Sequence, residues 1–194
     1  MTPLPDKQAL GGVFKLLLAM TVFAIPAGML RAEDVAEPED YRMSHFRAPV
    51  PDTLKGARVV TSEQAHDIWK AGNTVFVDVL PQAPKPDKLP KNVIWRDKPR
   101  VTIKGAAWLP NVGFGKLHET MHEFFSDELE TLTGGNKSKP VLFYCLLDCW
   151  MSWNAAKRAV EYGYKDVTWY PDGTDGWTLQ DYPTETVLPK FPKK

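Results

Sequence analysis

The sequence predicts an α/β fold of three layers, in which helices cover both faces of a central parallel sheet of about five strands. Short apolar runs at 74–80 and 140–144 have the β-branched and aromatic composition of strands that are buried on both faces. Segments with helical spacing of apolar residues lie between such runs. Because strands and helices alternate along the chain, parallel pairing through helical crossovers is favoured over hairpins.

The first elements of the domain are a short strand at 57–60 and a helix that Thr61 or Ser62 caps. Apolar residues recur at helical spacing through this segment, and Gly72 ends it. The run TVFVDVL at 74–80 is then a buried strand, whose single charged residue lies near the carboxyl end.

The next segment, 81–100, contains five prolines among many charged residues, which excludes a helix or a central strand. We expect a long surface loop there, of the kind that carries function or lacks order. A short strand or turn follows at 103–110, and an amphipathic helix at 117–132 ends before Gly134.

The last elements surround the two cysteines of the chain. The buried strand 140–144 delivers one cysteine at its carboxyl end, and Ser152 is predicted to cap a helix over 153–162. A final strand at 167–170 is followed by the turn-rich segment PDGTDGW at 171–177.

Composition divides the chain into four parts. Two lysines ahead of the apolar run 16–25, followed by small residues, predict a signal peptide at 1–32. That run is shorter than the roughly 20 apolar residues of a membrane span, so we expect export to the periplasm without stable membrane insertion after cleavage. An extended arm at 33–56, the folded domain at 57–182 and a C-terminal tail at 183–194 complete the chain.

The charge balance argues against nucleic acid as a partner. The 194 residues carry 24 Lys and Arg against 24 Asp and Glu. Removal of residues 1–32 leaves 21 basic against 23 acidic side chains, a net charge of −2. Binding to phosphates needs an excess of basic side chains, which this composition does not supply.

Cys145 is the strongest candidate for chemistry, because it lies between a buried strand and the start of a helix. Backbone N–H groups of the loop and the helix dipole stabilise a thiolate there, and the same N–H groups would bind an anion. Asp78 ends a strand at the same edge of the sheet and is expected to support the site. The residues assigned to the anion or substrate loop are Leu146, Leu147, Asp148, Trp150, Met151 and Ser152.

Cys149 is predicted to resolve a mixed disulfide or persulfide on Cys145, since one loop turn brings it back within reach. A disulfide between the two would close a very short loop, which suggests redox or nucleophilic use more than structural stapling. The alternative is a pair of inert, partly buried thiols. Trp150 either forms a wall of the site or packs in the core, and Asp148 either faces Cys145 or points to solvent.

The order of these segments resembles the rhodanese-like family over nearly all of the chain after residue 32. The matching pieces are VFVDVL around Asp78, IKGAAWLP at 103–110, VLFYC ending at Cys145, SWNAAKRAVEYGY after the loop, and VTWYPDGTDGW. The resemblance implies a sulfurtransferase in which Cys145 carries sulfane sulfur as a persulfide, inside a loop of backbone N–H groups.

Two departures from the family pattern concern the sulfur donor. The family's loop typically ends in an Arg that holds an anionic substrate, whereas CLLDCWMS has no Arg and includes Asp148. The Arg that often follows the strand-end Asp is also replaced, since Leu80 stands after Asp78. Thiosulfate is therefore expected to be held poorly, unless a distant cation such as Arg42 or Arg47 reaches the loop.

More narrowly, CLLDCWMSWNAAKR and YRMSHFRAPVP resemble a group of exported proteins named for a CxxxCW motif. This resemblance implies a setting in alcohol catabolism that depends on pyrroloquinoline quinone (PQQ), and redox or cofactor contact, without defining a reaction. The expected partners are a small sulfur donor or acceptor, or a periplasmic redox protein.

The two cysteines are also compatible with functions other than sulfur transfer. The pair Cys145 and Cys149 could exchange disulfides, or could hold Cu(I) with Met151 completing the site. A non-catalytic interaction module is a further alternative. The segment HETMH at 118–122 matches the HExxH of zinc hydrolases, but no obvious third ligand follows it, so no metal site is predicted there.

Overall fold

The computed structural model describes residue 1, residues 35–83 and residues 85–192. The expected signal peptide, 1–32, lies outside the described residues apart from Met1. The fold lies in the unit Glu33–Lys194. None of the helices in the described ranges has the length and apolar character needed to cross a membrane.

Five parallel strands form the central sheet, which confirms the predicted fold class. Their order is β1-β6-β5-β2-β4. The strands are β1 (Ala57–Val59), β2 (Val75–Asp78), β4 (Ala107–Trp108), β5 (Val141–Tyr144) and β6 (Val167–Tyr170). The register pairs Phe143 of β5 with Val77 on one side and Trp169 on the other, so β5 is central and is buried along its whole length.

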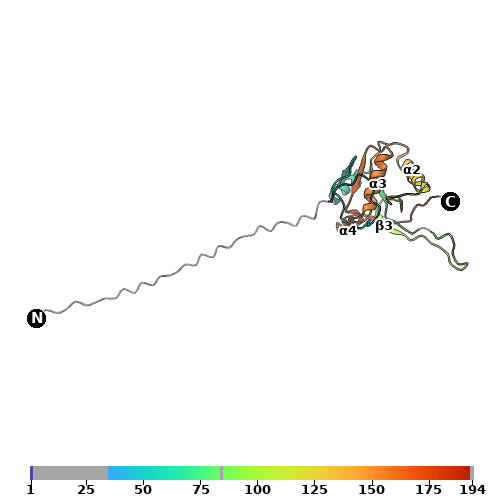
Figure 1. Cartoon of the computed structure of the whole chain (residues 1–194), viewed down its shortest axis with the longest axis horizontal. Coiled ribbons are helices and arrows are strands. Elements are labelled where there is room, and N and C mark those ends of the chain that lie inside the picture. The colour runs from blue at the N-terminus through green and yellow to red at the C-terminus, as the bar shows by residue number, and fades with distance from the viewer. Residues whose placement is uncertain (2–34, 84, 193–194) are drawn as a thin grey trace. The chain divides into compact units, whose positions relative to one another are not determined.

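Helices cover both faces of this sheet and complete the three layers (Figure 1). The helices are α1 (Ser62–Ala71), α2 (Glu119–Thr133), α3 (Trp150–Glu161) and α4 (Gly173–Leu179). Val141 and Phe143 of β5 pack in the core shared with α2 and α3, whereas Leu142 and Tyr144 pack in the core shared with α1 and α4. Cys145 continues this alternation and packs on the α2 and α3 side.

Helix α1 begins and ends where the sequence predicts. Thr61 is its N-cap, and a capping box links the side chains of Thr61 and Gln64 to each other's backbone N–H groups. Gly72 adopts a left-handed conformation with φ of 72° and its N–H donates to the Trp69 carbonyl, which ends the helix.

The helix after the cysteines begins earlier than the prediction of a Ser152 cap. The N-cap of α3 is Cys149, and the helix begins at Trp150. Ser152 lies in the first turn, where its hydroxyl donates to the Cys149 carbonyl at 2.9 Å and accepts from Trp169 Nε1 at 3.0 Å. Burial of Trp150 favours helix in this turn although no side chain caps it, since tertiary packing supplies most helical stability.

A second sheet of two strands is absent from the sequence prediction. β3 (Arg100–Ile103) pairs antiparallel with β7 (Thr184–Val187), so the C-terminal segment expected as a tail contributes a strand. Helix α4 forms in the turn-rich segment, where Trp177 is fully buried. Both elements are short, and long-range packing rather than local pattern holds them in place.

The arm before β1 lies along α3. The Arg42 N–H donates to Asn154 Oδ1, and Asn154 Nδ2 donates to the Arg42 carbonyl, each at 2.9 Å. Trp153 Nε1 donates to the Thr53 carbonyl at 3.1 Å. The segment between β2 and β3, drawn in green in Figure 1, runs out from the domain and back.

Candidate functional site: the cysteine loop after β5

The predicted site residues Asp78 and Cys145 lie where two neighbouring parallel strands end. Asp78 is the last residue of β2 and is the register partner of Tyr144, which Cys145 follows. Both are fully buried. Cys145 belongs to the core on the α2 and α3 side, whereas Asp78 shares the Thr102 hydroxyl with Tyr144 on the other side. Asp78 therefore lies behind the cysteine loop rather than in front of the sulfur.

A buried ion pair forms the base of the site. Arg100 Nε donates to Asp78 Oδ2 at 2.5 Å, and the Thr102 hydroxyl donates to the same oxygen at 2.5 Å. The Leu80 N–H donates to the other carboxylate oxygen at 2.9 Å. Burial raises the pKa of Asp78, and the charge of Arg100 and these hydrogen bonds oppose that rise. A buried carboxylate with this many partners is a fixed anchor for the strand ends.

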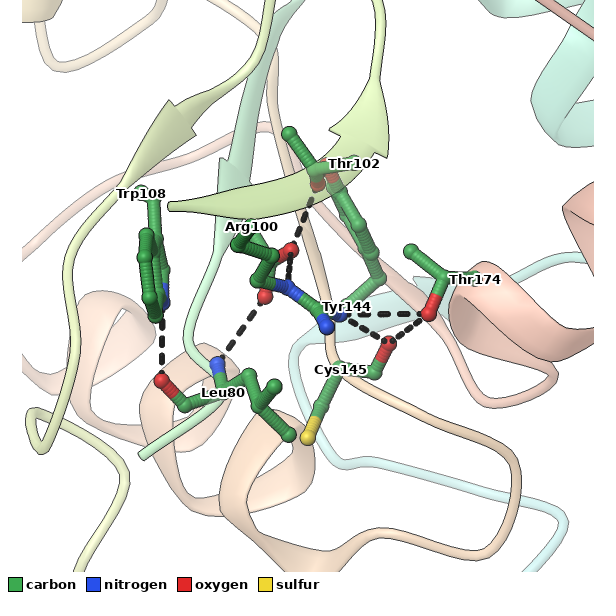
Figure 2. Close-up of polar contacts among 8 residues, drawn as sticks. Leu80, Arg100, Thr102, Trp108, Tyr144, Cys145 and Thr174 are labelled. Atoms are coloured by element: carbon green, nitrogen blue, oxygen red, sulfur yellow. Dashed lines mark hydrogen bonds and ion pairs between the residues drawn. The ribbon is translucent and has the colours of Figure 1, made fainter. Parts of the chain in front are cut away.

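Arg100 links this anchor to the cysteine loop (Figure 2). Its Nη2 donates to the Thr174 hydroxyl at 3.1 Å and to the Cys145 carbonyl at 3.5 Å. The Thr174 N–H donates to the same carbonyl at 3.0 Å. Figure 2 shows the Cys145 sulfur directed away from Arg100. The network thus holds the backbone of Cys145 and leaves its sulfur on the far side.

Gly173 allows α4 to approach the cysteine loop this closely. A Cβ at this position would lie 2.5 Å from the Cys145 carbonyl oxygen, and the residue has φ of 56°. Only glycine accepts both the close contact and the left-handed backbone without strain.

The other end of the loop is held by the N-terminal arm. Arg47 and Cys149 are partners in an isolated antiparallel bridge. The Ala48 N–H donates to the Asp148 carbonyl at 3.3 Å. Arg47 is exposed, so its charge lies beside Cys149 at the solvent boundary. The structure therefore brings the predicted supporting residue Arg47 to Cys149.

Trp150 joins the arm to the first turn of α3. It is buried, its backbone N–H donates to the Phe46 carbonyl at 2.9 Å, and its Nε1 donates to the Pro49 carbonyl at 3.0 Å. The Arg42 guanidinium lies 5.1 Å from the centre of its ring. Trp150 was expected either to form a wall of the site or to pack in the core, and these contacts show that it packs in the core.

Cys145 and Cys149 form a buried pair of free thiols. The Cys145 thiol donates a hydrogen bond to the Cys149 sulfur. This hydrogen bond is the main reason why the pKa of Cys149 is lowered to about 7. The N–H groups of Met151 and Leu146 and the charge of Arg47 also lower it, against the effect of burial. Burial and the neighbouring Cys149 raise the pKa of Cys145 well above its usual value. The hydrogen bond therefore favours ionisation of Cys149 before that of Cys145.

The remaining loop residues have distinct environments. The N–H of Leu146 contacts the sulfurs, and Met151 is buried with its N–H directed to Cys149. Leu147 is 44% exposed, and its N–H donates to Asp175 Oδ2 at 2.9 Å. Asp148 is exposed with φ of 52°, in the left-handed region that Asp tolerates better than most residues.

Sequence reasoning missed Arg100, Thr174 and Asp175. The resemblance expects a basic residue two positions after Asp78, where Leu80 stands, whereas Arg100 pairs with Asp78 from β3, 22 residues away. No local pattern signals this pairing, because the proline-rich segment between Asp78 and Arg100 has no periodicity. Thr174 and Asp175 reach the loop only because α4 forms.

No metal site is found within the described part of the chain, where no three His, Cys, Asp or Glu side chains gather in a suitable arrangement. In the HETMH segment His118 precedes α2 as its N-cap, and His122 Nδ1 is hydrogen bonded to the Tyr162 hydroxyl at 2.8 Å. The soft sulfur ligands of the loop, Cys145, Cys149 and the expected third ligand Met151, are all buried.

Two cavities of about 760 Å³ and 690 Å³ are lined by the segment between β2 and β3. The larger also contacts α2 and Phe191 near the C-terminus, and the smaller contacts Arg100 and Trp108. Neither is lined by Cys145 or Cys149. The thiol pair and these cavities are separate features of the domain.

The fold and the site define an α/β domain with a cysteine loop at the carboxyl end of its central strand. The family model of the rhodanese-like domain matches residues 31–180, and the chain belongs to this family. No curated protein matches the sequence.

Similar solved structures include a rhodanese-like domain from Anabaena sp., with 17% identity and a TM-score of 0.45, covering 66% of this chain and 78% of that chain. The polysulfide-sulfur transferase of Wolinella succinogenes is 17% identical with a TM-score of 0.41, covering 67% of this chain and 79% of its own. Thiosulfate sulfurtransferase from Pseudomonas aeruginosa is 17% identical with a TM-score of 0.44 over 66% of this chain, and the match spans 20% of that enzyme. The activities named are those of these proteins.

Proposed function

We propose that this protein is a sulfurtransferase that carries sulfane sulfur as a persulfide on Cys145 and uses Cys149 as a second thiol. One observation carries the proposal: two free thiols share a hydrogen bond in the loop after the central strand of a rhodanese-like domain. Such a pair supplies both a protected sulfur and a thiolate near neutral pH.

Loading begins with proton transfer from Cys145 to the Cys149 thiolate along their hydrogen bond. The Cys145 thiolate then attacks the terminal sulfur of a donor R–S–SH. A new S–S bond forms at Cys145, the donor S–S bond breaks, and RS⁻ leaves with the bonding electron pair. Cys149 acts as the base because, when ionised, it already accepts the Cys145 proton in a hydrogen bond. The transfer runs uphill, since the pKa of Cys145 lies above that of Cys149, and attack on the donor draws it forward.

Release follows one of two routes. An acceptor such as cyanide attacks the outer sulfur, takes it as thiocyanate and leaves Cys145 as the thiolate. In the second route Cys149 first passes the proton gained during loading to the departing RS⁻ or to water. Its thiolate then attacks the inner sulfur of the Cys145 persulfide, forms a Cys145–Cys149 disulfide and expels HS⁻. A dithiol, such as a redox protein, then reduces that disulfide and becomes oxidised itself.

Thiol–disulfide exchange is the second candidate function. The lowered pKa of Cys149 and its contact with Cys145 favour it, since exchange requires a thiolate with a second thiol in reach. In this case the same loop cycles between dithiol and disulfide and carries no sulfane sulfur.

We further propose that the protein acts in the periplasm with a small sulfur donor or acceptor, or a redox protein, as its partner. The basic and apolar pattern of residues 1–32 supports export. The resemblance of the CxxxCW segment supports a link to PQQ-dependent alcohol catabolism. N-terminal sequencing of protein from the periplasmic fraction tests the location: a start near Glu33 is expected, and a start at Met1 or Thr2 contradicts it.

Transfer of sulfur to cyanide tests the assignment of the two cysteines. Cys145→Ser is expected to abolish thiocyanate formation, because a hydroxyl oxygen cannot hold sulfane sulfur. Cys149→Ser is expected to retain single-turnover loading at a reduced rate and to lose HS⁻ release through the internal disulfide. If Cys145→Ser still forms thiocyanate, the assignment is wrong; if wild type forms none but is found as a disulfide, the exchange function replaces it.

A further inference from the structure

We propose that Arg47 of the N-terminal arm recognises the sulfur donor: it lies beside Cys149 and binds the carboxylate of an anionic thiol persulfide, of which cysteine persulfide is the simplest. This inference rests on the proposed function and names the class of donor. It also gives the arm, which contributes no strand to the parallel sheet, a part in the reaction.

The arm brings Arg47 to the Cys149 end of the loop. Arg47 and Cys149 are partners in an isolated antiparallel bridge, and the Ala48 N–H donates to the Asp148 carbonyl at 3.3 Å. Residues directly opposite each other in an antiparallel pair direct their side chains to the same face. After the hydrogen bond from Cys145, which is the largest cause, the charge of Arg47 also lowers the pKa of Cys149. The arginine and the sulfur therefore lie on one side of the bridge.

Arg47 is available to a ligand. Its side chain is exposed, whereas Cys149 opposite is only 2% exposed. Within the described part of the chain, the Arg47 guanidinium makes no hydrogen bond and no ion pair. A guanidinium presents planar N–H donors that match a carboxylate. A donor that enters between the arm and the loop therefore meets this cation before it reaches either sulfur.

The arm is the basic side of this entrance. Residues 41–51 contain two arginines, Arg42 and Arg47, and no acidic residue. Asp148 is an exposed negative charge on the loop side, and it repels an anion that approaches the loop backbone. The anionic group of a donor is therefore favoured on the arm side, at Arg47, with the reacting sulfur directed toward the cysteines.

The loop favours a persulfide over thiosulfate. Three of its N–H groups already donate to acceptors within the protein, those of Leu147, Trp150 and Ser152. Thiosulfate leaves as sulfite, whose oxyanion needs several converging donors. A thiol persulfide R–S–SH gives its terminal sulfur to Cys145, its S–S bond breaks, and RS⁻ leaves with the electron pair. Such a donor needs a cation only for its carboxylate, which lies a few bonds from the reacting sulfur.

A pair of alkylating reagents tests the inference without sulfur transfer. Iodoacetate and iodoacetamide react with the same thiolate, but only iodoacetate carries a carboxylate. The ratio of their rates at Cys149, mapped by fragment mass, cancels any change in the pKa of the thiol. Arg47→Ala should lower the iodoacetate-to-iodoacetamide ratio about fivefold, the scale of two unit charges about 4 Å apart in water. Arg47→Lys keeps the charge and should stay within about twofold of wild type.

Arg58→Ala is the matched control, because Arg58 is an exposed arginine of β1, which lies two strands from β5 in the sheet. Its ratio should equal that of wild type. In about 1 M salt the wild-type ratio should fall to that of Arg47→Ala, since salt screens the charge pair. The same ratio in wild type and Arg47→Ala at low salt, or an equal loss in Arg58→Ala, overturns the inference.

Loading of Cys145 tests the same residue in the proposed reaction. Cysteine persulfide and cysteamine persulfide differ only in the carboxylate, and loading is measured by intact mass. Arg47→Ala should slow loading from cysteine persulfide about fivefold more than loading from cysteamine persulfide. An equal change with both donors contradicts the assignment. If neither donor loads any variant, the proposed function is wrong, and the ratio of alkylation rates still decides the role of Arg47.

Discussion

The two ends of the cysteine loop are held in different ways. At the Cys145 end a buried ion pair between Asp78 and Arg100 supports the backbone carbonyl, together with Thr174. At the Cys149 end the arm makes backbone hydrogen bonds to the loop, Trp150 bonds the Pro49 carbonyl, and Arg47 lies beside Cys149. The first end is anchored by a buried charge pair, whereas the second is held by the arm, which contributes no strand to the central sheet.

This difference separates the end of the loop that positions Cys145 from the end that controls access to the two sulfurs. Both sulfurs are buried, with Cys149 only 2% exposed, so a donor reaches them only after some part of the loop moves. Lifting the arm breaks backbone and side-chain hydrogen bonds to the loop and to α3, whereas moving the Cys145 end requires breaking a buried charge pair. We therefore expect movement of the arm to give access to the sulfurs, while the Asp78 network keeps the backbone of Cys145 in place.

Arg100→Met should cause the largest change. It leaves the Asp78 carboxylate buried without its cation and should lower the free energy of unfolding by about 3 to 5 kcal/mol, measured by urea denaturation. Arg58→Met, at an exposed arginine of β1, is the control and should change it by less than about 0.5 kcal/mol. Equal losses in both variants would mean that the Cys145 end is not specially anchored.

Coupling between the two sulfurs gives the next largest effect. In wild type the alkylation rate of Cys149, mapped by peptide mass, should rise with a midpoint at about pH 7. Cys145→Ala removes the hydrogen bond that lowers this pKa, so the midpoint should move up toward the ordinary value of about 8.5. Below the midpoint the thiolate fraction falls, so the variant should react more slowly than wild type at pH 7. A midpoint that is the same with and without Cys145 would show that the thiols are not coupled.

A substitution in the arm should cause the smallest of the three changes, a faster alkylation of the cysteines. Ala48→Pro removes the N–H that donates to the Asp148 carbonyl, while Ala48→Ser keeps it. Loss of one hydrogen bond of about 1 kcal/mol should speed alkylation of the cysteines roughly fivefold in Ala48→Pro. Ala48→Ser should react like wild type. If the proline variant reacts no faster, access to the sulfurs is controlled elsewhere.

The parts of the site that follow from local sequence pattern could be predicted from the sequence. Asp78 and Cys145 follow buried runs, and the shared direction of parallel strands brings such ends to one edge. Arg100 was not predictable in this way, because it reaches Asp78 from 22 residues away across a proline-rich segment with no periodicity. Ser152 resembled a helix cap, but the buried Trp150 decides where α3 begins. Asp175 depends on α4, whose glycines predict a turn rather than a helix.

The position of sulfane sulfur tests the central claim most directly. Wild type, Cys145→Ser and Cys149→Ser are incubated with cysteine persulfide under anaerobic conditions, and intact and peptide masses are recorded. The account predicts a gain of one sulfur atom on the peptide of Cys145 in wild type and in Cys149→Ser, and no gain in Cys145→Ser. Sulfane sulfur found on Cys149 when Cys145 is replaced, or no gain in any of the three, would contradict it.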